Sequence, residues 1–264
     1  MLPYLQIGPL RLWTYGLMLT CGLWSGFYLF RAEVKRRGLP VDASALMLAI
    51  AVAGIICAKA YHVVVTLMLT EHQAVAWRDL FNFAGLAWNG GLIAGFAVLL
   101  WFACRKRVSI WSLLDAASPA AAVGYAFGRM GCFLAGDGDY GKPTNLPWGM
   151  SFPHGLVPTA QRVHPTPLYE IAGSLVLFVV LMRISNPLSP KDGENGAPKN
   201  VRPGTVFSVY LIGSGVFRFA VEFIRLNPPA FLGVTEAQVI SLLSIVAGAA
   251  LLARSRSSVL ASAD

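Results

Sequence analysis

The chain has 264 residues, of which 56% are hydrophobic and only 13% charged, a composition too apolar for an ordinary soluble domain. The formal net charge of +8 does not indicate a nucleic-acid partner, because the basic residues lie in short clusters between apolar runs and form no basic face interleaved with aromatics. The sequence therefore predicts an integral membrane protein. Its four cysteines show no CxxC spacing, so we expect neither a disulfide framework nor a zinc site; they are Cys21, Cys57, Cys104 and Cys132.

Seven apolar runs approach the roughly 20 residues that a helix needs to cross a bilayer. The first run has no basic segment before it and no evident small-residue cleavage site after it, so we expect a retained helix and not a signal peptide. The sequence thus predicts an all-α integral membrane protein with seven transmembrane helices in a single polytopic membrane domain, 1–264. The predicted spans are 12–30, 45–69, 85–104, 110–127, 168–184, 205–224 and 237–252.

Basic residues predict the orientation of these spans. Connections after the first, third, fifth and seventh runs carry clusters of Lys and Arg, whereas the opposite connections carry scattered basic residues mixed with acidic ones. The positive-inside rule then places the N-terminus outside and the C-terminus in the cytoplasm. On this topology residues 128–167 form an ordered extracytoplasmic loop between helices 4 and 5. The Pro-, Gly- and Asn-rich stretch 185–204 would be a flexible cytoplasmic linker.

The stretch 128–141, GRMGCFLAGDGDYG, follows an apolar run but carries one Arg and two Asp among five Gly. We expect a polar loop here and not part of a spanning helix. Arg129 offers a planar fork of donors that suits a phosphate, and Asp137 or Asp139 could orient it or accept protons. Ionisable groups at such a boundary are functional candidates. The alternative is a glycine-rich hairpin whose Arg caps helix carbonyls.

A second group of charges lies in and after the sixth run. Arg218, Glu222 and Arg225 are spaced i, i+4, i+7, so they project from one helical face. They could form an anion site in which Glu222 holds Arg218, or a buried pair that ties helices together. Lys59 is the only charge in the second run, and we expect it to face the same cavity as Arg129 and Arg218. This outward-opening site would suit a phospholipid headgroup.

Two further stretches stand at helix ends. Asn89, Gly90 and Gly91 begin the third run, where the glycines could admit a headgroup or serve close helix packing. His164 and Glu170 lie in HPTPLYE at the start of the fifth run, where proline suits the first helical turn. A structural role is favoured for both of these side chains.

Taken in order along almost the whole chain, these residues resemble the bacterial prolipoprotein diacylglyceryl transferase family. No single match is decisive, but so many matches in the family's order are hard to obtain by chance. The matching stretches are Tyr15 to Met18, Lys59 with Tyr61, Gly90 to Ile93, Gly128-Arg129, Pro147 to Met150, Phe152-Pro153, His164 to Thr166, Leu168-Tyr169-Glu170, Arg218-Phe219, Glu222-Phe223 and Arg225.

The resemblance implies a seven-span enzyme of the bacterial cytoplasmic (inner) membrane. It would transfer diacylglycerol from phosphatidylglycerol to the thiol of a lipobox cysteine in a prolipoprotein signal peptide, releasing glycerol phosphate. We expect a monomer that needs no metal, nucleotide or nucleic acid. Arg129 and Arg218 would stabilise the leaving phosphate, and Asp137 or Glu222 would take the thiol proton. The residues expected to contact substrate are Tyr15, Lys59, Asn89, Gly90, Gly91, Asp139, His164, Tyr169, Glu170 and Arg225.

The sequence also departs from the family's usual pattern. Asn89 stands where the family has His, and Lys59 stands where Arg is expected; Cys132, Ala135 and Asp137 replace two Asn and a Glu. Because Asn cannot act as a base, the main alternative is a relative that uses the same lipid donor with another acceptor. A covalent role for Cys132 and a small transporter are weaker alternatives, the latter because the sequence has no internal repeat of the kind such transporters show.

Overall fold

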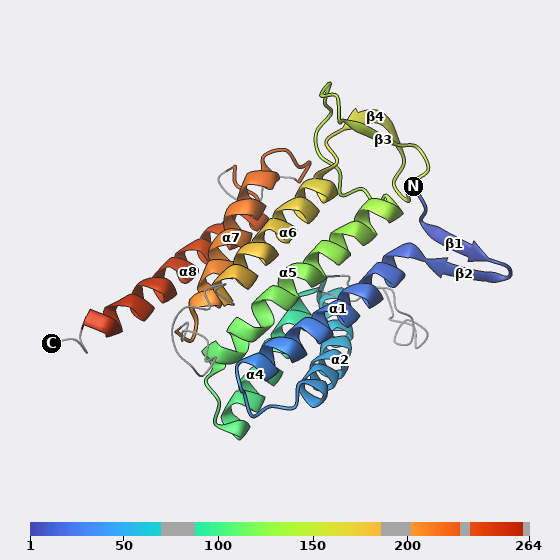
Figure 1. Cartoon of the computed structure of the whole chain (residues 1–264). Coiled ribbons are helices and arrows are strands. Elements are labelled where there is room, and N and C mark those ends of the chain that lie inside the picture. The colour runs from blue at the N-terminus through green and yellow to red at the C-terminus, as the bar shows by residue number, and fades with distance from the viewer. Residues whose placement is uncertain (70–87, 186–201, 228–232, 261–264) are drawn as a thin grey trace. The chain divides into compact units, whose positions relative to one another are not determined.

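The computed structural model describes residues 1–69, 88–185, 202–227 and 233–260, and this part of the chain is mostly helical (Figure 1). Two antiparallel two-stranded sheets accompany the helices, so the expectation of an all-α protein is correct only for the main body. The helices are α1 (Thr14–Arg36), α2 (Ala43–Leu69), α4 (Trp88–Lys106), α5 (Ile110–Ala135), α6 (Thr166–Ser185), α7 (Thr205–Glu222) and α8 (Glu236–Leu260). The strands are β1 (Tyr4–Ile7), β2 (Leu10–Trp13), β3 (Met150–Phe152) and β4 (Thr159–Val163).

Four of the described helices, α2, α6, α7 and α8, are long and apolar enough to cross a membrane. Helices α1, α4 and α5 match the other three predicted spans in position. Most of the predicted linker 185–204 lies outside the described residues.

The chain forms two compact units, residues 31–113 and residues 1–30 with 114–264. In the former, α2 and α4 pack along each other at a glycine. A Cβ on Gly90 would lie 2.4 Å from the backbone oxygen of Cys57 and 2.9 Å from Cα of Ala58, whereas a Cβ on Gly91 would meet only ordinary contacts. Close helix packing therefore accounts for Gly90. A contact of either glycine with substrate stays a prediction.

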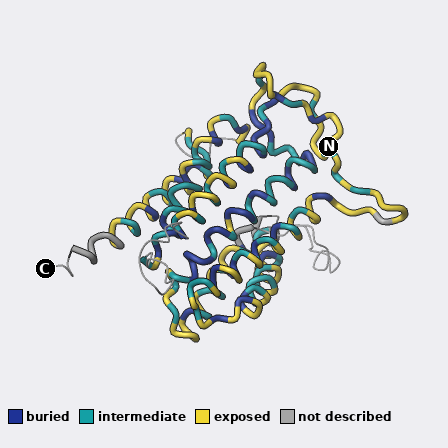
Figure 2. Tube along the Cα trace, in the orientation of Figure 1, coloured by how far each residue is buried: buried dark blue, intermediate teal, exposed yellow. Residues whose placement is uncertain are grey.

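In the larger unit α5 is the central helix, with α1 on one side and α6 on the other (Figure 1). Between residues 114 and 135 only Ala121 is exposed, as the dark turns of α5 indicate (Figure 2). Gly22 of α1 packs on Phe127, and the Ser174 hydroxyl of α6 donates to the backbone oxygen of Ala122 at 2.7 Å. A helix covered by protein on several sides does not need an apolar face toward lipid, so α5 can carry the charged side chains of Asp115 and Arg129.

The start of α7 is capped by a side chain from α5. Gly204, the residue before α7, has φ of 93° and no side chain to cap the helix. Instead the fully buried Asp115 carboxylate accepts hydrogen bonds from the backbone N–H groups of Gly204 (2.9 Å) and Phe207 (2.8 Å). Arg129 lies 129 − 115 = 14 residues after Asp115, and Arg218 lies 218 − 204 = 14 residues after Gly204. At a rise of 1.5 Å per residue, each arginine lies about 21 Å along its helix from this cap. The cap therefore places Arg129 and Arg218 at the same height along helices α5 and α7.

Helix α5 continues to Ala135, so the expectation that residues 128–135 belong to a loop is wrong. Two features explain the difference. The Arg129 guanidinium finds its partners beside the helix, including Tyr125 one turn earlier. Gly131 permits close contact with α1, because a Cβ there would lie 2.9 Å from the Tyr15 ring. The glycines that suggested a loop therefore include one that serves helix packing.

The connection from Gly136 to Pro165 contains the β3–β4 hairpin and lies where α5 ends and α6 begins (Figure 1). Its small core stacks Tyr140 on Phe152, with ring centroids 4.1 Å apart, next to buried Val163. The backbone N–H of Gly141 donates to the oxygen of His164 at 2.9 Å, and that of Lys142 donates to Ile224 at 2.7 Å. These bonds fasten the connection to the end of α7 and the start of α6, beside the charges described next.

Candidate active site

Three arginines from distant parts of the sequence converge on one buried carboxylate. Glu170, in the second turn of α6, is 1% exposed. Its Oε2 lies 3.2 Å from Arg129 Nε and 3.3 Å from Arg225 Nη1, and its Oε1 lies 3.5 Å from Arg218 Nη1. The structure thus brings together Arg129 and Arg218, as the sequence predicts. It adds Arg225 on the same carboxylate and shows that Glu170 joins all three.

Two more carboxylates complete this arginine cluster. Glu222 Oε2 lies 2.7 Å from Arg218 Nη1, so Glu222 holds Arg218 as expected, and its Oε1 accepts a hydrogen bond from Asn227 at 2.6 Å. Asp139 bridges two arginines: Oδ1 lies 2.6 Å from Arg225 Nη2, and Oδ2 bonds Arg129 Nη1. The alternative in which Arg129 merely caps helix carbonyls does not describe these contacts.

The cluster is balanced in charge and uneven in exposure. Three guanidinium groups meet three carboxylates, which is the pairing that buried charges require. The side chains of Glu170 and Glu222 are 1% and 0% exposed, whereas that of Asp139 is 34% exposed. Burial by itself raises the pKa of Asp139, but the guanidinium groups of Arg225 and Arg129 hold the pKa of that carboxyl below its ordinary value.

Two donors in the cluster retain hydrogen-bonding capacity. Arg218 Nη1 and Arg225 Nε are buried close to Glu222, at 2.7 and 3.8 Å, but have no partner in hydrogen-bond geometry among the described residues. The two nitrogens are close enough to Glu222 to form ion pairs, but their N–H bonds do not point at its oxygens in hydrogen-bond geometry. Glu222 Oε2, which lies near both donors, is also buried without a partner in hydrogen-bond geometry among the described residues, so these three atoms are paired by charge.

Tyr125 is a member of the site that the sequence analysis missed. Its hydroxyl accepts from Arg129 Nε at 3.1 Å and donates to Glu170 Oε1 at 2.7 Å. The Arg129 guanidinium carbon also lies 5.1 Å from the centre of the Tyr125 ring. The spacing i, i+4 from Tyr125 to Arg129 was available in the sequence, but it is informative only once α5 is known to continue past Arg129.

Asp137 and Cys132 lie beside the cluster. Asp137 Oδ1 accepts from the backbone N–H of Asp139 at 3.2 Å, and Cys132 Sγ is 4.0 Å from Arg129 Nη1. One ligand atom each from Cys132, Asp137 and Asp139 would lie within 4.8 Å of the others. However, Asp139 is already paired with two guanidinium groups, and their positive charge opposes a metal cation. The geometry therefore favours an anion over a cation here.

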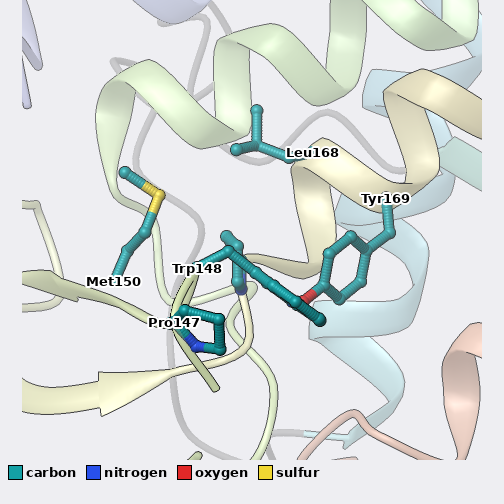
Figure 3. A pocket seen from close by; sticks show the side chains of 7 residues that line it. Pro147, Trp148, Met150, Leu168 and Tyr169 are labelled. Atoms are coloured by element: carbon teal, nitrogen blue, oxygen red, sulfur yellow. The ribbon is translucent and has the colours of Figure 1, made fainter. Parts of the chain in front are cut away.

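Tyr169 lines an adjacent apolar hollow of about 690 Å³, and His164 contacts Tyr169. Trp148 Nε1 donates to the Tyr169 hydroxyl at 2.8 Å, and the two side chains lie against each other (Figure 3). That hydroxyl also lies 3.2 Å from His164 Nδ1. The hollow is lined by Pro147, Trp148, Gly149, Met150, Pro165, Leu168 and Tyr169.

Arg162, which sequence reasoning also missed, holds one wall of the hollow. Its guanidinium donates to the backbone oxygens of Leu146, Pro147 and Gly149 at 3.0 to 3.2 Å. The loop that carries Trp148 is therefore held in place by hydrogen bonds from Arg162. Tyr169 faces this hollow while the next residue, Glu170, faces the arginines, so α6 connects the two.

The remaining predicted substrate contacts are distributed differently. Tyr15 packs on α5 at Gly131 and is 40% exposed. Lys59, on α2, belongs to the unit of residues 31–113 together with Gly90 and Gly91. Asn89 lies in the first turn of α4, but its side chain is outside the described residues. The contribution of these four residues of the smaller unit to the arginine cluster stays a prediction.

Comparison with known proteins extends these findings. Residues 3–254 match the family described as prolipoprotein diacylglyceryl transferase. The chain is similar to the phosphatidylglycerol–prolipoprotein diacylglyceryl transferase of Synechocystis sp., with 31% identity over 257 residues that cover 93% of this chain and 86% of the relative. Proteins of the same name from Clostridium tetani and Methylococcus capsulatus are also 31% identical, over 247 residues (92% and 93% of the two chains) and 261 residues (94% and 92%).

Proposed function

Because this chain belongs to the prolipoprotein diacylglyceryl transferase family, we propose that it transfers the diacylglyceryl group of phosphatidylglycerol to the thiol of a lipobox cysteine in a bacterial prolipoprotein. Glycerol phosphate is the other product. Relatives that carry this activity in their names match more than nine-tenths of the chain. The protein is therefore a transferase with a phospholipid donor and a secreted polypeptide as acceptor.

The observation that carries this proposal is the convergence of Arg129, Arg218 and Arg225 at one end of α5. A guanidinium fork matches two oxygens of a phosphate. Two N–H groups in the cluster lack a hydrogen-bond partner among the described residues. Arg129 and Arg218 hold the lipid phosphate and stabilise the charge that develops on it as it leaves, and Arg225 supports it from the end of α7.

The reaction is a single substitution. The acceptor sulfur attacks the lipid carbon that carries the phosphate oxygen, the S–C bond forms, and the C–O bond breaks with its electron pair on the phosphate. Placing the lipid carbon and the thiol side by side supplies much of the rate. A carboxylate takes the thiol proton. Of the two expected candidates, Glu222 is fully buried and bonded to Arg218 and Asn227, which suits positioning better than proton transfer, and Asp137 remains at the rim.

The finer membrane arrangement belongs to the same proposal. Seven spans agree with the seven long described helices, and the alternation of basic clusters supports an outer N-terminus and a cytoplasmic C-terminus. The protein would act as a monomer in the bacterial inner membrane. The arginine cluster then lies at the outer surface, where secreted precursors carry their signal peptides.

The acceptor is tested by product analysis. Purified enzyme receives phosphatidylglycerol and a lipobox peptide, and mass spectrometry reads the peptide for added diacylglycerol. Because Asn89 replaces a potential base, a relative with another acceptor is the second candidate. A modified non-peptide acceptor beside an unmodified peptide would establish that alternative.

The phosphate site is tested in the same assay. Removing one donor that stabilises a developing charge costs about 10² to 10³ in rate, so Arg129→Ala and Arg218→Ala should each lose transfer by at least that factor. Arg11→Ala is the matched control, because Arg11 lies over Tyr4 in the β1–β2 hairpin and should leave transfer unchanged. Full activity in either cluster variant rejects the assignment.

A further inference from the structure

We propose that the Asp139 carboxylate occupies the place of the donor phosphate, is displaced from Arg129 and Arg225 when the lipid binds, and then accepts the proton of the incoming thiol. This inference rests on the proposed function and adds a residue role and an order of events to it. In the described structure the Asp139 carboxylate occupies the phosphate-binding position of the cluster, and lipid binding displaces it.

The first step of the argument is the shape of the contact. The two oxygens of Asp139 bond different arginines: Oδ1 lies 2.6 Å from Arg225 Nη2 and Oδ2 contacts Arg129 Nη1. Two oxygens of a phosphodiester bridge two guanidinium groups in the same manner. The carboxylate therefore marks where the phosphate binds, and both anions cannot occupy that position together.

The second step concerns which carboxylate can leave. Glu170 and Glu222 are buried on α6 and α7 with exposures of 1% and 0%, while the Asp139 side chain is 34% exposed and lies on the connection after α5. The Asp139 backbone is held, because its carbonyl oxygen accepts from the Thr166 hydroxyl. Displacement is therefore a rotation of one side chain toward solvent and needs no movement of a helix.

The third step is the charge balance. Three arginines and three carboxylates sum to zero, so adding a phosphodiester with one negative charge leaves an excess of one. Taking up one proton restores neutrality. The guanidinium groups hold the pKa of Asp139 low in the closed cluster. Once the phosphate pairs with these guanidinium groups, Asp139 loses the cations that lowered its pKa. Asp139 is therefore the carboxylate that accepts the thiol proton.

The chemistry balances with this assignment. The thiol proton moves to the Asp139 carboxylate, sulfur bonds to the lipid carbon, and the C–O bond breaks with its electron pair on the phosphate. Glycerol phosphate leaves with one more negative charge than the diester carried, and Asp139 then releases its proton to water and returns to the arginines. Lipid binding thereby frees Asp139 to act as a base. This compensates for Asn89, which stands where the family has His and cannot accept the proton.

The test uses Asp139→Asn, which keeps the size of the side chain and removes its charge and basicity. Binding of short-chain phosphatidylglycerol should tighten by about tenfold, because a charge-assisted contact no longer has to be broken. The turnover number at pH 7 should fall by about 10² or more, the usual contribution of a positioned base. Asp137→Asn is the matched variant from the same connection.

A pH profile separates proton transfer from structural damage. The charged and titratable groups that face Asp139 are Arg129 and Cys132 of α5, Arg225, Asp137 and Tyr15 of α1. A free thiol ionises near pH 8.5, so turnover by Asp139→Asn should rise by roughly tenfold or more between pH 7 and 9, as the acceptor loses its proton without help. Wild-type turnover should rise far less.

Three results would overturn the inference. Weaker lipid binding by Asp139→Asn would show that the carboxylate supports the site. Tighter binding with undiminished turnover would show that it blocks the site but takes no proton. The same pattern in Asp137→Asn and not in Asp139→Asn would move the role to Asp137. Failure of the proposed function is distinguishable, because it would appear as absent thiol modification in the wild type or as full transfer by Arg129→Ala.

Discussion

At the scale of single residues, Glu170 organises the site. Its two oxygens contact Tyr125 and all three arginines, yet from the sequence it would be placed at an ordinary helix start. Proline chemistry explains why α6 begins near Thr166, but it contains no information about what approaches from α5 and α7. A buried carboxylate with three cationic neighbours can be recognised only after the helices are assembled.

Replacing this carboxylate tests its importance. Glu170→Gln preserves volume but leaves an uncompensated positive charge in a buried cluster, and removing one partner of such a pair costs about 3 to 5 kcal/mol. We expect transfer to be lost and the thermal unfolding midpoint in detergent to fall clearly. His164→Asn, which alters the contact with the Tyr169 hydroxyl, should shift the midpoint much less. A Glu170→Gln protein as stable as the wild type would contradict the central role.

At the scale of elements, the cap from Asp115 to the start of α7 holds the two arginine-bearing helices in register. Asp115→Ala leaves the N–H groups of Gly204 and Phe207 buried without this acceptor. Loss of a helix cap costs about 0.5 to 2 kcal/mol, and we expect the upper end because Asp115 is fully buried. Ser118→Ala is the control, since among the described residues the buried Ser118 hydroxyl bonds the backbone oxygen of Leu114 in its own helix. Denaturation in detergent measures both variants, and equal stabilities would refute the cap's contribution.

The same elements show what the sequence could predict. Helical spacing placed Arg218, Glu222 and Arg225 on one face, and the structure agrees with it. The predicted end of α5, residue 127, falls eight residues (135 − 127) before the observed end, because the glycines there were interpreted as loop residues. Gly131 instead admits Tyr15, a contact between segments more than a hundred positions apart. The β1–β2 hairpin was missed, and only its last two residues, 12 and 13, fall within the predicted span 12–30.

At the scale of the whole molecule, the number of spans decides on which side of the membrane each terminus lies. Hydropathy alone selects α2, α6, α7 and α8, and an even number of spans leaves both termini on one side. Seven spans place them on opposite sides. Under the seven-span proposal α5 is missed by hydropathy because it is covered by neighbouring helices and carries Asp115 and Arg129 for contacts within the protein.

Cysteine labelling distinguishes the two arrangements. The four native cysteines are replaced with Ser, transfer activity is confirmed, and single cysteines are introduced by Gln6→Cys, His154→Cys and Ser189→Cys. A membrane-impermeant maleimide should label the first two in intact spheroplasts, because the N-terminal hairpin and the β3–β4 connection face outward under the positive-inside rule. Ser189→Cys should react only after permeabilisation. With only α2, α6, α7 and α8 as spans, one helix separates positions 6 and 154 and one separates 154 and 189, so Gln6→Cys and Ser189→Cys would react from one side and His154→Cys from the other. Labelling of all three from one side would remove α6 from the count.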